Sequence, residues 1–481
     1  MVERDAQRPA RADGQTAVPF ERRLDARLVA SIVAAGSLSF CAVVFETAMN
    51  VALPALMKEF AVDTATIQWI TSGYLLMLSV MIPTFPFLKA RFPLRRLFIV
   101  AVLAFLAGTL MAAAAPSFPI LLLGRVVQGV GTGIAIPLMF SIVIDQVPYE
   151  QMGLMMGVAS LITSFAPAVG PSYGGIVMEI AGWRMVFLCL VPIVVLSFIV
   201  GSLCVRQATP LGRPRFDVLG FVLVAIGFFS LIYGINLASR EGLGLSVLLI
   251  FALCVAALAG FGVHGRRSDD ALINLEVFAY PSFVLSVVVV ASVAFAILGF
   301  AYLVPNYAQL ALGASASLSG TLLLPGCALV MISPIGGRIL DRVGAAVPVA
   351  IGMVLMLAST ALYTAFAASL TPMLMLAFYV LFGLGQGLGF STTMTHGLMC
   401  LPERLRTDGN SLFNTMQQLG GSVGVSAVTA VVGAAQAGAS DMTAATAVGG
   451  FWAFVLLFVV IVVAAASSIA AFRLKKMQRG A

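Results

Sequence analysis

Two ionisable residues lie inside long apolar stretches of the sequence, Glu46 in FETAMNVALP and Arg125 in GRVVQGVGTG. Such a pair can bind and release a proton, because burial disfavours a charged carboxylate whereas a nearby cation favours it. Asn50 follows Glu46 by one helical turn, and Gln128 follows Arg125 by three residues, so each helix face would add a polar side chain. Glu46, Arg125, Gln128 and Asn50 are therefore the candidate proton-coupling residues.

The elements that carry these residues are predicted to span a membrane. Of the 481 residues, 60% are apolar and only 10% are charged, and the mean hydropathy of +1.06 excludes a water-soluble domain. A spanning helix needs about 20 mostly apolar residues, and we count fourteen such runs. They lie approximately at 28–53, 66–87, 97–115, 119–142, 153–178, 184–204, 217–238, 245–264, 282–305, 317–336, 346–367, 372–398, 410–436 and 449–472. The predicted fold class is an all-α integral membrane protein.

The distribution of basic residues predicts the orientation of these helices. All but four of the 27 Lys and Arg fall in segments on one side if both termini face the cytoplasm. This bias sets the topology of a multi-pass protein of the cell membrane and does not indicate a nucleic-acid partner. Residues 1–27 are polar and rich in arginine, without a cleavable signal, and are expected to form a disordered cytoplasmic tail. Residues 473–481 would form a second cytoplasmic tail.

An internal repeat divides the predicted helices into two groups. At an offset of 251 residues, NVALP aligns with AYLVP, and SLITSFAPAVG aligns with SLFNTMQQLGG. The alignment predicts two six-helix halves, 28–204 and 282–472, with the two helices of 217–264 inserted between them. Parallel halves of this kind are typical of transporters that rock about a site at the membrane midplane.

The repeat bears on the two buried charges. At the offset of 251 residues neutral Ile297 is equivalent to Glu46, and at the slightly larger offset that aligns QGVG (128–131) with QGLG (386–389) neutral Gly383 is equivalent to Arg125. The charges therefore belong to one site and are not required by the scaffold. An ionisable residue at such depth costs at least about 2.5–3.5 kcal/mol and usually marks an ion or substrate path. A purely structural Glu–Arg pair is the alternative that the sequence leaves open.

The sequence resembles the fourteen-span drug:proton antiporter branch of the major facilitator superfamily from about residue 28 onward. The motifs that carry the resemblance are TAMNVALP, QWITSGYLL, GRVVQGVGTG, APAVGPSYGG and GGRILDRVG, and RFPLRRLF is most similar to the subgroup that exports lincosamides and other drugs. The resemblance implies a proton-coupled antiporter that exports hydrophobic or cationic small molecules by alternating access, a multidrug efflux activity that gives antibiotic resistance. Its expected partners are the substrate, protons and the lipid bilayer.

Two of these motifs are expected to take part in the conformational change of transport. Small residues of the fifth span form a face that another helix can approach closely, and the resemblance implies an antiporter hinge, although generic packing is the alternative. The hinge candidates are Gly170, Pro171, Gly174 and Gly175. The resemblance also implies a cytoplasmic latch in the loop after the tenth span. The latch candidates are Gly337, Arg338, Asp341, Arg342 and Gly344. The matching first loop has Ala90 at the place of the family's aspartate, so no carboxylate latch is expected there.

Aromatic side chains that could cover an amphipathic ligand provide the candidate substrate cavity. They are Trp69, Tyr74, Phe300, Tyr302 and Tyr307. The sequence has no GxxxxGK[ST] stretch for ATP and no HExxH or Ser-His-Asp arrangement for catalysis. The six cysteines are scattered singly, without metal-ligand spacing. We therefore expect no enzyme activity, no metal and no cofactor, and a proton gradient as the energy source.

Two other functions remain compatible with the sequence. A lipid or glycolipid flippase of the same fold would also need a membrane-embedded apolar cavity with few charges. A non-transporting membrane sensor or assembly partner belongs to a different class, and the absence of a long soluble domain and the presence of buried charges disfavour it.

Overall fold

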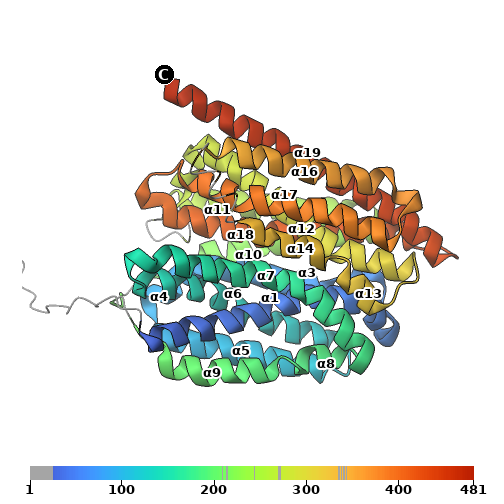
Figure 1. Cartoon of the computed structure of the whole chain (residues 1–481), viewed down its shortest axis with the longest axis horizontal. Helices are drawn as coiled ribbons and strands as arrows, with labels where there is room; N and C mark the ends of the chain where they lie inside the picture. The colour runs from blue at the N-terminus through green and yellow to red at the C-terminus, as the bar shows by residue number, and fades with distance from the viewer. Residues whose placement is uncertain are drawn as a thin grey trace, which may run out of the picture.

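A computed structural model of the protein describes residues 25–207, 210–212, 215–242, 244–268, 272, 274–333, 336, 339, 342 and 344–480. Every regular element within these ranges is a helix. Figure 1 shows the long helices running along the long axis of the molecule, with α1 and α5 to α9 on one side and α12 and α16 to α19 on the other. We call these groups the amino-terminal and the carboxy-terminal bundle.

The amino-terminal bundle begins where Asp25 caps the first helix, its carboxylate accepting a hydrogen bond from Leu28 N at 2.7 Å. The second predicted span is broken into short helices, because Pro83 and Pro86 lack the N–H groups that a continuous helix needs. The bundle consists of α1 (Ala26–Phe60), α2 (Thr64–Ile67), α3 (Trp69–Met81), η1 (Ile82–Thr84), α4 (Phe85–Arg91), α5 (Leu94–Ala113), α6 (Phe118–Gln146), α7 (Tyr149–Ala181), α8 (Trp183–Leu188) and α9 (Val191–Cys204).

A helical hairpin follows, formed by α10 (Val218–Glu241) and α11 (Leu245–Gly265). The short η2 (Leu275–Ala279) then leads to the carboxy-terminal bundle. This bundle consists of α12 (Pro281–Leu310), α13 (Ala316–Thr321), α14 (Leu324–Leu329), η3 (Val330–Ile332), α16 (Ala346–Ala365), η4 (Ala367–Ser369), α17 (Pro372–Leu398), η5 (Glu403–Leu405), α18 (Arg406–Gln436) and α19 (Met442–Gly480).

Within the described residues, 12 helices are long and apolar enough to cross a membrane. The expected fifth and tenth spans coincide with α7 and with the shorter apolar segment Ala316–Ile332, which is divided into α13, α14 and η3. The prediction of an all-helical membrane protein is confirmed. The count of fourteen spans and the role of the hairpin as an insert stay predictions.

Hydrogen bonds join the two bundles toward the end of the molecule where α1 terminates. They run between Asn306 Nδ2 and Asn50 O (3.1 Å), Gln309 Nε2 and Val51 O (3.1 Å), Ser172 Oγ and Gly320 O (3.3 Å), Ser422 Oγ and Ser72 O (3.3 Å), the Ser72 and Ser426 hydroxyls (2.9 Å), and Thr64 Oγ1 and Gln436 Oε1 (2.7 Å). We call this set the seal. Buried apolar side chains of α1 and α12 form one continuous cluster around it, so the bundles are closed against each other on this side.

Candidate functional site

Arg125 is the most enclosed charged side chain of the amino-terminal bundle, with none of its surface exposed. Its Nη1 donates a hydrogen bond to Gln128 Oε1 at 2.8 Å, and its Nε donates to Ile70 O at 3.2 Å. The guanidinium also lies over the Tyr74 ring, 4.2 Å from the centroid. Among the residues that the structure describes, Arg125 Nη2 has no hydrogen-bond partner. The N–H groups of this nitrogen in a fully buried cation are thus left for a further acceptor.

The neighbours of Arg125 are held in turn by a second set of hydrogen bonds. Gln128 Nε2 donates to Thr109 Oγ1 at 2.7 Å, which ties α6 to α5. The Tyr74 hydroxyl lies 3.0 Å from Ala42 O and 2.8 Å from Thr132 Oγ1. The predicted association of Arg125 with Gln128 is therefore present, and Tyr74, expected in the substrate cavity, supports the arginine in this structure.

Glu46 is also buried, with 5% of its surface exposed. Among the residues that the structure describes, its carboxylate has no ion pair and no hydrogen bond, although Arg125 is close enough to interact with it electrostatically. A carboxyl group in this position can change its protonation without breaking a local bond. Arg125 is thus held by hydrogen bonds, whereas the nearby Glu46 carboxyl group is not, and we call these two residues the charge cluster. The direct contact that a purely structural Glu–Arg pair would require is not seen in this conformation.

Asn50 forms its side-chain hydrogen bond with Thr71 and not with Gln128. Its Oδ1 accepts a hydrogen bond from Thr71 Oγ1 at 2.9 Å, while its backbone oxygen takes part in the seal with Asn306. The side-chain Nδ2 is buried and has no hydrogen-bond partner in the described part of the chain. Asn50 thus lies one helical turn from Glu46 and touches both bundles, which links the acid to the bundle interface.

The other candidate cavity residues pack against protein. The Trp69 ring lies 6.0 Å from that of Phe229 and 6.3 Å from that of Tyr233, both on the hairpin. Phe300 is fully buried among aromatic rings of its own bundle, and Tyr302 is 2% exposed. The Tyr307 hydroxyl donates to Ala367 O at 3.0 Å. A role of these side chains in substrate binding stays a prediction.

The hinge candidates lie where α7 approaches two different helices. A Cβ added to Gly170 would lie 1.9 Å from Thr47 Oγ1, and one added to Gly174 would lie 2.6 Å from Ala48 O, both on α1. A Cβ on Gly175 would lie 2.4 Å from Ala316 O in the other bundle, and Pro171 O closely faces Gly320. The small-residue face thus allows α7 to contact its own bundle and the opposite one at the same height.

The latch candidates are only partly described. Gly337, Arg338 and Asp341 lie outside the described residues. Arg342 is helical, and Gly344 has a positive φ of 87° that glycine adopts easily.

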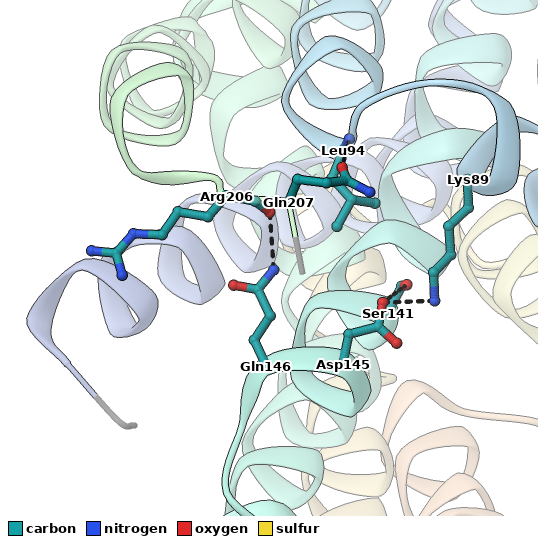
Figure 2. A network of polar contacts seen from close by, with 7 residues as sticks. All are labelled: Lys89, Leu94, Ser141, Asp145, Gln146, Arg206 and Gln207. Atoms are coloured by element: carbon teal, nitrogen blue, oxygen red, sulfur yellow. Dashed lines mark hydrogen bonds and ion pairs between the residues drawn. The ribbon is translucent and has the colours of Figure 1, made fainter. Parts of the chain in front are cut away.

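The first loop contains a charge pair that the sequence reasoning missed. Figure 2 shows Lys89 of α4 directed at Asp145 of α6, with Nζ 2.7 Å from Oδ2. Ser141 Oγ donates to the same carboxylate at 3.2 Å. The signals available in the sequence were Lys89, a basic residue beside Ala90, and Asp145, an acid in the last turn of α6. The amino-terminal half therefore carries a carboxylate contact, supplied by α6 and confined to one bundle.

A second contact fixes the segment that follows α9. Gln146 Nε2 donates to Arg206 O at 3.1 Å, and Leu94 N donates to Gln207 Oε1 at 2.8 Å (Figure 2). Arg206 in turn forms an ion pair with Asp25 at 2.8 Å. The ends of α1, α5, α6 and α9 are thereby tied together on the side opposite the seal.

Sequence comparison identifies the family of the chain. The profile described as Major Facilitator Superfamily matches residues 35–425. The chain belongs to the Major Facilitator Superfamily. Its members are transporters rather than enzymes, in agreement with the expectation from the motifs.

Relatives within the superfamily confirm the resemblance to drug exporters. The chain is 32% identical to the lincomycin resistance protein LmrB of Bacillus subtilis (strain 168) over 413 residues, 85% of this chain and 86% of the relative. It is 32% identical to the uncharacterized MFS-type transporter YcnB of the same organism over 96% of this chain and 97% of the relative. The crystal structure of the POT family transporter PepTSo shares the fold, with a TM-score of 0.67 at 15% identity, covering 95% of this chain and 99% of that one.

Proposed function

We propose that the protein is a proton-coupled antiporter that exports hydrophobic or cationic small molecules across the cell membrane. In this proposal it has fourteen spans, the hairpin of α10 and α11 is an insert between two six-helix halves, and both termini are cytoplasmic. Relatives named for lincomycin and multidrug resistance support the substrate class.

The observation that carries the proposal is the unattached, buried carboxyl group of Glu46 beside the fixed cation Arg125. When the site faces the cytoplasm, the deprotonated carboxylate attracts a cationic substrate. When it faces outside, a proton replaces the substrate on Glu46. The backbone oxygens of Asn50 and Val51, one helical turn after Glu46, accept hydrogen bonds of the seal. Binding of a proton or substrate at Glu46 therefore takes place next to the contacts that must break in the state that is open on the seal side.

The test is uphill transport by Glu46→Gln in proteoliposomes with an imposed pH gradient, using ethidium and lincomycin as probes. We expect the variant to lose gradient-driven accumulation while it still exchanges labelled substrate across the membrane without a gradient. Glu59→Gln is the matched control, because Glu59 lies on the same helix and pairs with Arg184 at the surface. Uphill transport with normal pH dependence in Glu46→Gln would place the proton site elsewhere.

A further inference from the structure

A crevice of about 340 Å³ lies between the hairpin, η2 and α18, outside the charge cluster. Its lining is almost entirely apolar and includes Val224 and Phe228 of α10 and Leu419 of α18, all nearly buried. Pro83 of the amino-terminal bundle also reaches it. The crevice thus lies where the hairpin and both bundles meet, and its volume is at the lower end of the range of about 300–1,000 Å³ for ligand pockets.

One charged side chain, the exposed Arg266, lines the crevice. Asp217, next to the start of α10, already has other partners: its Oδ1 lies 2.7 Å from His264 Nε2 and accepts a hydrogen bond from Gly220 N at 2.8 Å, while its Oδ2 accepts from Leu272 N at 3.3 Å. Asp269 and Asp270 lie outside the described residues. Within the described part of the chain, the Arg266 side chain forms no ion pair or hydrogen bond.

The apolar lining and the single arginine together indicate which class of molecule the crevice can bind. An almost entirely apolar lining favours a hydrocarbon chain, and a guanidinium at the exposed edge favours a phosphate, which it can bind with two parallel N–H groups. A cationic molecule would be repelled by the same residue. Most of the crevice is lined by α10, α11 and α18, which are long and apolar enough to cross a membrane, and this favours an occupant drawn from the bilayer.

We propose that this crevice binds one anionic phospholipid of the surrounding bilayer, with an acyl chain between α10 and α18 and the phosphate on Arg266. The bound lipid would fill the gap between the hairpin and α18. The site is independent of proton coupling, and its test measures lipid retention in place of transport.

The experiment is native mass spectrometry of the full chain in detergent, titrated with phosphatidylglycerol or phosphatidylcholine. We expect one phosphatidylglycerol to be retained, and Arg266→Gln to weaken its binding by about tenfold while phosphatidylcholine binding stays weak. Arg267→Gln is the matched control, because it removes the same charge from the adjacent exposed residue that does not line the crevice. Equal loss in both variants would overturn recognition of the headgroup by Arg266. Equal retention of both lipids would overturn selectivity for a net anionic headgroup, because phosphatidylcholine carries a phosphate too but is zwitterionic.

A second series tests the apolar part of the site. Gly262 lines the crevice, and a Cβ added there would meet no atom within 4 Å, so the fold admits a methyl group at this position. Gly262→Ala and Gly262→Leu should weaken phosphatidylglycerol binding progressively, whereas Val263→Leu, on the exposed face of the same helix, should leave it unchanged. Unaltered retention in Gly262→Leu would show that the lipid binds elsewhere.

Discussion

The two bundles use the same close helix contact but surround it with different side chains. In the amino-terminal bundle a Cβ on Gly170 would lie 1.9 Å from Thr47 Oγ1, and in the carboxy-terminal bundle a Cβ on Gly421 would lie 2.4 Å from Leu298 Cδ1. Gly421 and Leu298 follow Gly170 and Thr47 by the same 251 residues that relate the repeated sequences. The close helix contact at these glycines thus belongs to the shared scaffold.

The buried polar chemistry differs between the same two regions. Arg125 occupies a polar pocket of the first bundle, whereas Gly383, at the equivalent position, faces Gly326 O so closely that an added Cβ would lie 1.9 Å away. No long side chain fits there. The second bundle instead fills its interior with aromatic rings around Phe300. This contrast indicates that the scaffold allows movement, while one bundle alone carries the ionisable site.

The largest expected effect on stability comes from removing the fixed cation. Arg125→Met should destabilise the protein by about 3–5 kcal/mol, because it leaves Gln128 and Ile70 O without their donor and Glu46 without a compensating charge. Thermal unfolding in detergent measures the change. Glu46→Gln is the contrast: it should unfold at or above the wild-type temperature, since Glu46 forms no described bond. Equal destabilisation by both substitutions would favour a structural ion pair.

The corresponding position of the other bundle should be sensitive for a steric reason. Gly383→Ala should cost about 1–3 kcal/mol, because α17 must move away from α14 to admit the methyl group. Gly389→Ala, on the same helix, is the control, since its Cβ would lie at an ordinary 3.5 Å from Gly352 Cα. Melting temperature and folded yield measure both. A stable Gly383→Ala protein would mean that the absence of an arginine there is not a packing requirement.

The sequence predicted the shared scaffold better than the polar contacts. Hydropathy located helices, and the repeat aligned the fifth span with the segment whose glycines bring α18 to α12, because both signals are read directly from residue types along the chain. The association of Arg125 with Gln128 was also local. Asn50 was predicted to join that group, yet it contacts Thr71 and Asn306. Lys89 and Asp145 were missed. Their partners depend on how helices rotate and pack, which residue spacing within one helix does not determine.

A smaller effect is expected where the two bundles meet. Asn306→Ala removes the hydrogen bond to Asn50 O across the interface and another to Tyr302 O within α12. A loss of about 1 kcal/mol in the seal shifts a two-state equilibrium by roughly fivefold toward the state that is open on this side. Spin labels at the exposed Lys58 and Ser440 should then show longer distances. Asn414→Ala, which removes an exposed hydrogen bond to Asn410 O, should leave them unchanged.

The smallest effect concerns two exposed ion pairs, one in each bundle, at the end opposite the seal. Glu276, just before α12, pairs with Arg404, and the hydrogen bonds from this arginine hold the pKa of the glutamate below its ordinary value of 4.5. The pKa of Asp25 is lowered below its ordinary 3.8 mainly by the backbone N–H of Leu28, and only then by Arg206.

Because both carboxyl pKa values are lower in the folded state, the stabilisation is present above the ordinary values and is lost as the pH falls through the folded pKa. Arg404→Gln should therefore lower the melting temperature slightly at pH 7, and the difference from wild type should shrink below about pH 4 as Glu276 becomes protonated. Arg206→Gln should have a weaker effect, because the helix cap on Asp25 survives the substitution. A larger effect of Arg206→Gln would mean that the arginine, and not the cap, holds the start of α1.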